Sequence, residues 1–317
     1  MWTLTPDQPA SSLGRMNRRQ TIGSVAATTA MVLVGSSVAA ASALADYPIA
    51  GGQALRYALA AALLLLLARG RLPRLTRRQA LRLVALAATG LAGFNALLIA
   101  AVREADAASV GVVVGCVPVV LALAGPLLER RPLSGRVMSA ALLVVIGAAA
   151  VQTGGRTTLL GVLLAVGALA CEAAFTLLAV PLLGSVGPAA TSTYTCLLAA
   201  PMLLAAGAAV DGGDALRVPS PGEATALGYL AATVTAAGFV LWYAGVERLG
   251  VERAGLCAGL VPVSALLSAA AIGASEISTV PLLGALAVAA GVTAGMTARP
   301  AQPVRRATDI RRQLLAC

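Results

Sequence analysis

The chain has 317 residues, of which 59% are hydrophobic and 11% are charged, and its formal net charge is +10. Soluble domains carry about 25% charged and roughly 45–50% apolar residues, so the composition excludes an ordinary soluble domain. No His or Lys occurs, which excludes zinc-protease motifs and nucleophiles activated by His. The five Cys residues show no CxxC spacing, and no GxxxxGK[ST] loop occurs, so we expect no metal, no cofactor and no ATP drive.

Long apolar runs between short charged or Pro/Gly-rich breaks predict an all-α integral membrane protein with ten transmembrane helices. The spans are expected at 22–44, 51–68, 81–101, 107–128, 134–151, 158–183, 188–210, 222–243, 252–273 and 280–297. An alternative for the first span is a twin-arginine signal peptide cleaved after Ala45, but its apolar run exceeds the roughly 7–15 residues of a signal core.

The distribution of Arg predicts the orientation. If residues 1–20 form a cytoplasmic segment, nineteen of the 23 basic residues, all Arg, fall in cytoplasmic segments, and only Arg103, Arg156 and Arg217 fall outside. A multi-pass protein of the cell (plasma) membrane with both termini cytoplasmic is therefore expected, with 298–317 as a basic tail on anionic lipid. This topology explains the pI near 10.4 without nucleic acid.

An internal repeat divides the chain. "GVVVGCVPV" (111–119) and "GLCAGLVPV" (255–263) share five positions at an offset of 144, and "AGF" (92–94) recurs at 237–239. With five spans in each period, the pattern predicts a 5+5 inverted repeat with units 21–151 and 152–297. The paired Pro118 and Pro262 then kink facing helices beside a translocation path, whereas for one copy alone helix packing is the simpler interpretation.

These residues resemble the EamA branch of the drug/metabolite transporter superfamily. Similar features are "ALRYALAAALLLLLARGR" (54–71), "VPVVLALAGPLLERRPLSG" (117–135), "VPVSALLSAAAIGASEIS" (261–278) and "LWYAGVERLGVERAG" (241–255). The sequence departs from the family where "LVGSS" (33–37) replaces a usual "WG" and Glu172 replaces a common Trp. The resemblance implies ten helices, cytoplasmic termini and transport of a small metabolite, usually outward.

Several polar residues in or near spans are candidates for the substrate site, each with a structural alternative. Arg56 either functions or snorkels to the outer headgroups, and Asn95 either faces substrate or bonds a neighbouring helix. Trp242, with Tyr243, is either an interfacial belt residue or part of an aromatic cavity wall. Glu129 and Glu276 fall at helix ends, where solvation at the membrane interface or helix capping is the simpler role.

Glu172 is the strongest candidate because it lies near the middle of the sixth span. A carboxylate at bilayer depth normally faces the bundle interior or water, and there it exchanges a proton or holds a cation. Helical spacing puts it on one small, weakly polar face, which we expect to be inward; that face contains Ala165, Ala168, Glu172, Thr176 and Ala179. The alternative is a protonated Glu with a structural hydrogen bond.

The function predicted is a secondary transporter that exports a small organic metabolite, amino-acid-like or drug-like, with proton coupling through Glu172 as an option. Its expected partners are that small-molecule substrate, the lipid bilayer, protons and a second copy in a homodimer. An intramembrane enzyme is disfavoured because no His, metal-ligand cluster or paired intramembrane acids occur. A non-transporting receptor or scaffold leaves the inverted repeat unexplained.

Overall fold

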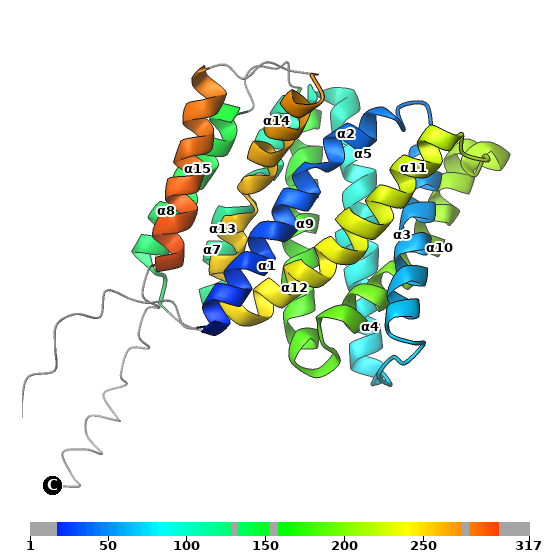
Figure 1. Ribbon diagram of the computed structural model, residues 1–317, viewed down its shortest axis with the longest axis horizontal. Helices are drawn as coiled ribbons and strands as arrows, with labels where there is room; N and C mark the ends of the chain where they lie inside the picture. Colours follow the sequence, from blue (N-terminus) through cyan, green and yellow to red (C-terminus); the bar gives the residue numbers. More distant parts are fainter. Residues whose placement is uncertain (1–17, 129–131, 152–157, 274–278, 298–317) are drawn as a thin grey trace, which may run out of the picture.

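The computed structural model describes residues 18–128, 132–151, 158–273 and 279–297, and within these ranges it is all-helical without strands (Figure 1). The α-helices are α1 (Arg18–Gly35), α2 (Ser37–Ser42), α3 (Ile49–Leu67), α4 (Arg77–Ala87), α5 (Phe94–Glu104), α6 (Ala107–Val114), α7 (Val117–Leu128), α8 (Gly135–Val151), α9 (Leu159–Val186), α10 (Pro188–Asp211), α11 (Pro221–Tyr229), α12 (Gly238–Leu249), α13 (Val251–Cys257), α14 (Leu260–Ala271) and α15 (Thr279–Thr297). Two π-helical turns, η1 (Ala88–Gly93) and η3 (Leu230–Ala237), and a 3₁₀ turn, η2 (Gly212–Ala215), complete them.

Eight helical segments of the described chain are long and apolar enough to cross a membrane. They are Ile49–Leu67, Arg77–Glu104, Ser109–Leu128, Leu159–Leu183, Pro188–Ala215, Pro221–Leu249, Val251–Ala271 and Thr279–Thr297. Large apolar side chains such as Leu66 and Leu159 remain exposed on their outer surfaces, as lipid contact requires. The chain is therefore a multi-pass membrane protein. The predicted first and fifth spans do not meet this criterion, and α8, the fifth, is apolar but only 17 residues long.

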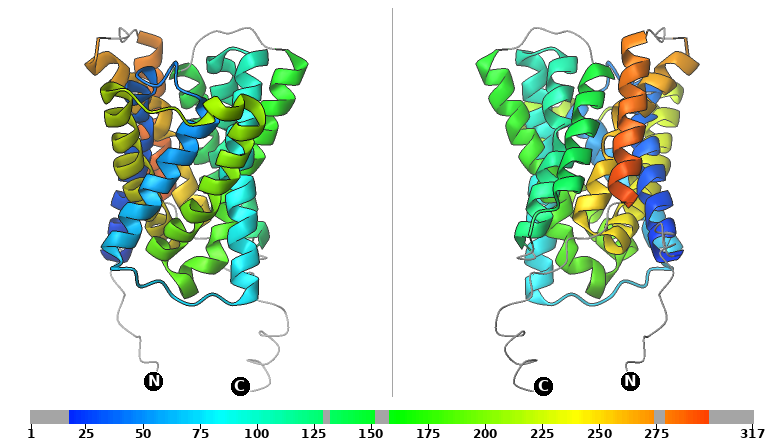
Figure 2. Two further views of the ribbon diagram at one scale, coloured as in Figure 1. Left: turned by 90° about the vertical axis from the view of Figure 1, so that its right-hand side faces the viewer. Right: turned by 90° about the vertical axis from the view of Figure 1, so that its left-hand side faces the viewer.

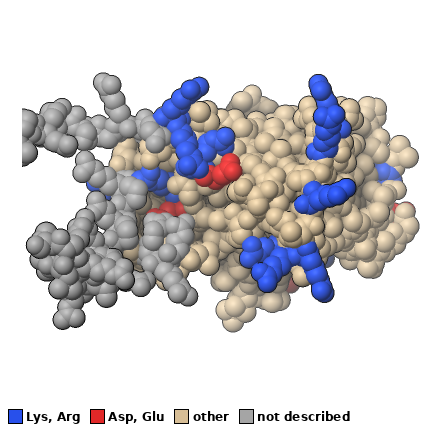
Figure 3. Space-filling view, turned by 90° about the horizontal axis from the view of Figure 1, so that it is seen from below, with Lys and Arg blue, Asp and Glu red and all other residues tan. Residues whose placement is uncertain are grey.

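The ends of the bundle define two faces. The start of α1, the α3–α4 connection and the end of α15 lie together on the lower face of Figure 1, whereas the α2–α3 and α10–α11 connections lie on the upper face (Figures 1 and 2). Seen from below, the described part of the lower face carries more basic than acidic side chains (Figure 3). Six Arg residues occur between positions 69 and 82, in and beside the α3–α4 connection.

The eighth predicted span ends later than the sequence analysis placed it. We expected its end at residue 243, but α12 continues to Leu249. Arg248 remains in the helix because its Nη1 donates to the Ala244 carbonyl at 2.9 Å, and it also lies 3.7 Å from a Glu247 carboxylate oxygen. Gly250 then ends the helix with a positive φ of 81°, a conformation that favours glycine.

Irregular turns occur at matching places in the two halves. The π-helical turn η1 interrupts α4–α5, and η3 interrupts α11–α12 at the equivalent point. The hydroxyl of Thr89 donates to the Ala85 carbonyl at 2.7 Å, and the hydroxyl of Thr233, 144 positions later, donates to the Tyr229 carbonyl at 2.6 Å. These turns support the internal repeat, because the two halves share backbone geometry as well as sequence motifs.

Small residues allow the closest helix contacts. A Cβ atom on Gly147 of α8 would lie 2.6 Å from the Gly284 carbonyl oxygen of α15, so these backbones touch. Gly255 of α13 lies against Leu121 of α7 in the same way, because an added Cβ would meet the Leu121 Cβ at 2.8 Å. Part of the repeated glycine motif therefore serves helix packing, as its structural interpretation predicts.

Candidate functional site

One cavity of about 1060 Å³ lies between the two halves of the bundle. The first half contributes Arg56 and Asn95 to its wall, and the second contributes Glu172 and Trp242. Residues 44, 45 and 47–49, in and beside the α2–α3 connection, also line it, so the cavity extends to the upper face. All six candidate residues named from the sequence border this space, including Pro118 and Pro262.

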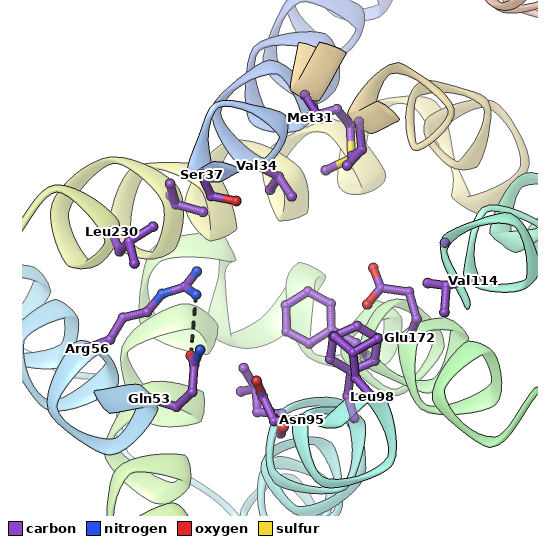
Figure 4. Close-up of a pocket in the computed structure, with 18 of the residues that line it drawn as sticks. Met31, Val34, Ser37, Gln53, Arg56, Asn95, Leu98, Val114, Glu172 and Leu230 are labelled. Atoms are coloured by element: carbon purple, nitrogen blue, oxygen red, sulfur yellow. Dashed lines mark hydrogen bonds between the residues drawn. The ribbon is translucent and has the colours of Figure 1, made fainter. Parts of the chain in front are cut away.

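Arg56 projects from α3 into the cavity, where Figure 4 shows its guanidinium pointing toward the centre. Its Nε donates to the Thr235 hydroxyl in η3 at 2.6 Å, and its Nη1 donates to the Gln53 Oε1 at 3.3 Å. The guanidinium also lies 5.6 Å from the centroid of the Tyr57 ring. The snorkelling alternative for Arg56 is not supported, because these hydrogen bonds direct its guanidinium into the cavity.

Asn95 performs the structural role and also borders the cavity. Its side-chain amide donates to the Leu91 carbonyl at 2.8 Å and to the Tyr57 hydroxyl at 3.3 Å. Leu91 belongs to η1, where the backbone hydrogen bonds deviate from the α-helical pattern, so the amide provides an additional partner there. The two alternatives offered for this residue are thus compatible in one side chain.

Glu172 lies on α9, and its carboxylate points into the cavity from the side opposite Arg56 (Figure 4). Among the described residues its carboxyl group neither donates nor accepts a hydrogen bond, so the interhelical bond of the structural alternative is not formed with them. The predicted inward face of this helix is confirmed. Its other members are almost fully buried: Ala165, Ala168, Thr176 and Ala179.

An aromatic cluster packs at the wall of the cavity, which Phe175 and Trp242 line. Trp242 is 4% exposed, and its Nε1 donates to the Thr176 hydroxyl at 3.2 Å. The Tyr243 ring is fully buried and stacks on Phe175 at a centroid distance of 5.1 Å. The interfacial-belt interpretation of Trp242 and Tyr243 is therefore wrong, because both rings pack inside the bundle. No residue of the described α3–α4 connection, 68–76, lines the cavity.

Pro118 and Pro262 each follow a break in a helix. Gly115 and Cys116 separate α6 from α7, and Ala258 and Gly259 separate α13 from α14. A Pro lacks the N–H that would bond the carbonyl four residues earlier, and its ring crowds that carbonyl, so the α-helical pattern is lost just before it. Both breaks border the cavity, which Gly115 and Ala258 help to line.

A cluster of side chains at the upper face links the two connections beside the cavity mouth. Arg217 forms a two-point ion pair with Glu223 and lies 4.7 Å from the Tyr47 ring centroid. The Tyr47 hydroxyl donates to the Arg217 carbonyl at 2.7 Å, and Tyr47 itself lines the cavity. The hydrogen bond to Glu223 raises the pKa of Arg217 above its ordinary value, so the guanidinium stays charged.

Sequence reasoning missed Gln53 and Thr235, which hold the Arg56 guanidinium. Gln53 lies three residues before Arg56, a helical spacing that could have suggested the contact, whereas the contact with Thr235 depends on tertiary structure. Glu129 and Glu276 lie outside the described residues. Within those residues, no group of three His, Cys, Asp or Glu side chains comes close enough to hold a metal ion.

Comparison with known proteins identifies the family. The sequence matches the EamA-like transporter family over residues 21–153 and again over 159–295. The chain belongs to the EamA-like transporter family. The resemblance noted in the sequence is thereby confirmed, and two copies of the EamA unit account for most of the chain.

Solved structures share the EamA fold of this chain. Twenty-seven chains match, and one of them, described only as a crystal structure of a protein, has a TM-score of 0.77 and 19% sequence identity. The alignment covers 87% of this chain and 97% of that chain. At this identity the likeness shows the fold alone. No curated protein matches the sequence.

Proposed function

We propose that this EamA protein is a secondary transporter that exports a small organic metabolite through the central cavity. The observation that carries the proposal is the cavity itself, because both halves of the chain line it and interrupted helices from each half border it. Secondary transporters with internal repeats bind substrate at such an interface, near discontinuous helices. A volume of about 1060 Å³ is ample for a metabolite.

The proposal includes the topology. We propose that α1–α2 and α8 also cross the membrane, which gives ten spans in a 5+5 inverted repeat. Both termini then lie in the cytoplasm, and the protein lies in the plasma membrane. The Arg-rich lower face supports this orientation, since cytoplasmic loops carry an excess of Arg (Figure 3). Reporter fusions at residues 70–80 and after residue 297 should then report cytoplasm, and fusions at 211–220 the outside. An outside report after residue 297 would contradict the ten-span topology.

Proton coupling through Glu172 is the mechanism we propose. Its carboxylate faces the cavity and receives no hydrogen bond from the described residues, so a proton or a substrate cation can occupy it in turn. Exchange of the two at one carboxylate would couple outward movement of substrate to inward movement of protons. The cavity that reaches the upper face would be the outward-facing state of this cycle.

Metabolite export tests the proposal. Solutes released by cells that produce the protein would be profiled, and flux of each enriched solute would then be measured in proteoliposomes. Leu98→Trp, which fills the cavity, should lower the flux, whereas Leu163→Trp, on the exposed surface of α9, should not. Absence of any enriched solute, or full flux through Leu98→Trp, would contradict transport through this cavity.

A further inference from the structure

Two groups of opposite charge face the cavity without pairing with each other. Arg56 enters from α3 and Glu172 from α9, on opposite sides of the space (Figure 4). In the described part of the chain Arg56 bonds only Thr235 and Gln53, both neutral. An ionised side chain at bilayer depth is costly unless another charge or water compensates it. Each of these two groups therefore has room for a charged partner that the described chain does not supply.

The Arg56 side of the cavity suits an anion. A guanidinium has five N–H donors, of which the Nε–H bonds Thr235 and one Nη1–H bonds Gln53. The remaining donors, including both on Nη2, have no partner among the described residues. Because Thr235 and Gln53 fix the plane of the group from two helices, the unused donors are held ready for a carboxylate or phosphate.

The Glu172 side suits a cation. An ionised carboxylate only accepts hydrogen bonds, and no described residue donates one to Glu172. A protonated amine has donors for this carboxylate, and it is the partner that a lone acid at this depth requires.

Aromatic rings connect the two charged sides. Tyr57, next to Arg56, lies 6.3 Å from the Phe239 ring, and Phe239 lies 4.9 Å from Phe175, which follows Glu172 by one helical turn. All three rings line the cavity. A molecule that reaches from Arg56 to Glu172 therefore passes over an apolar surface, which accommodates a hydrocarbon or aromatic portion between two charged groups.

We infer that the substrate is a small zwitterion, with its anionic group at Arg56 and its cationic group at Glu172. The inference rests on the proposed function and names the substrate class of the same cavity. A purely cationic solute would leave Arg56 without an anion, and a purely anionic solute would leave Glu172 without a cation. A zwitterion compensates both charges at once and carries no net charge across the membrane.

Direct binding to the purified full-length protein tests the inference independently of transport. The probes are leucine and 6-aminohexanoate, which are zwitterions, together with hexylamine as cation and hexanoate as anion. At least one zwitterion should bind about tenfold more tightly than hexylamine and hexanoate. Equal binding of either single-charged probe, or no binding of both zwitterions, would overturn the inference.

Variants assign each charge to its side. Arg56→Gln should lose the zwitterion and hexanoate but keep hexylamine, and Glu172→Gln should keep hexanoate and lose the other two. Arg56→Lys, which retains the charge, guards against a folding defect and should bind the zwitterion more weakly than the parent but better than Arg56→Gln. Loss of all probes in Arg56→Gln, with zwitterion binding retained in Arg56→Lys, would still assign the site to the charge. Unchanged selectivity in both Gln variants would contradict the assignment.

The result also separates the two proposals. Zwitterion binding without flux in proteoliposomes would contradict transport and leave the charge assignment standing. Equal flux of zwitterionic, cationic and anionic solutes would contradict the inference of a zwitterionic substrate and leave the transport proposal standing.

Discussion

Arg56 and Thr235 join the two halves of the bundle beside the cavity, through a 2.6 Å hydrogen bond from the Arg Nε to the Thr hydroxyl. Arg56 belongs to a regular helix, whereas Thr235 lies in the π-helical turn η3. A π-helical turn shifts the following side chains around the helix axis, and such turns are frequent at functional sites. Here the turn presents a hydroxyl to the guanidinium, so backbone irregularity and charge placement are linked.

Thr235→Val should weaken substrate binding by about tenfold, a loss of about 1.4 kcal/mol, because it removes the acceptor of Arg56 Nε while keeping the side-chain shape. Thr235→Ser retains the hydroxyl and should bind nearly as the parent does. Affinity would be measured on purified protein, with thermal stability as a check on folding. Equal affinity in the Val and Ser variants would show that Thr235 does not position Arg56.

Gly147→Ala should destabilise the bundle by about 1–3 kcal/mol, because the added methyl overlaps the backbone of α15. Gly184→Ala is the matched control. It lies in α9 with nothing within 4 Å of an added Cβ, so it should be neutral or stabilising by up to about 1 kcal/mol. Thermal unfolding in one detergent compares the two. A Gly147 variant as stable as the Gly184 variant would contradict direct backbone contact between α8 and α15.

Arg217→Ala should lower the unfolding temperature by a few degrees, since it removes the ion pair with Glu223 and the contact with the Tyr47 ring. The effect should shrink at high salt, which screens exposed charges. Arg103→Ala removes an exposed charge from the same face, where the described residues offer it no hydrogen bond, and should change stability little. Similar unfolding temperatures for both variants would contradict the structural role assigned to Arg217.

The sequence predicted the helical spans well because lipid requires long apolar runs, and eight predicted spans correspond to apolar helices of the structure. It also predicted the inward face of α9, since helical periodicity fixes which side chains share a face. The end of α12 was misplaced because Glu247 and Arg248 look like a loop, whereas local contacts keep them helical.

Other features of the site were beyond sequence reasoning. The residues of a π-helical turn are of the same types as those of an α-helix, so no sequence pattern distinguishes η1 and η3. The direction of Arg56 depends on how α3 is rotated and on Thr235, which is 179 positions away. The apolar runs therefore indicated where the chain crosses the membrane, and only the packed structure assigned Arg56 and Trp242 to the interior.

The most direct test of the account is the flux of an identified substrate in proteoliposomes at pH values between about 6 and 8, with Glu172→Gln compared with the parent. Gln keeps the size and hydrogen-bonding capacity of Glu but cannot ionise. If Glu172 couples transport to protons, the Gln protein should reach the membrane at normal levels yet lose flux or lose its pH dependence. Glu172→Asp should keep partial activity with a shifted pH profile. Parental flux by Glu172→Gln at every pH would contradict the account.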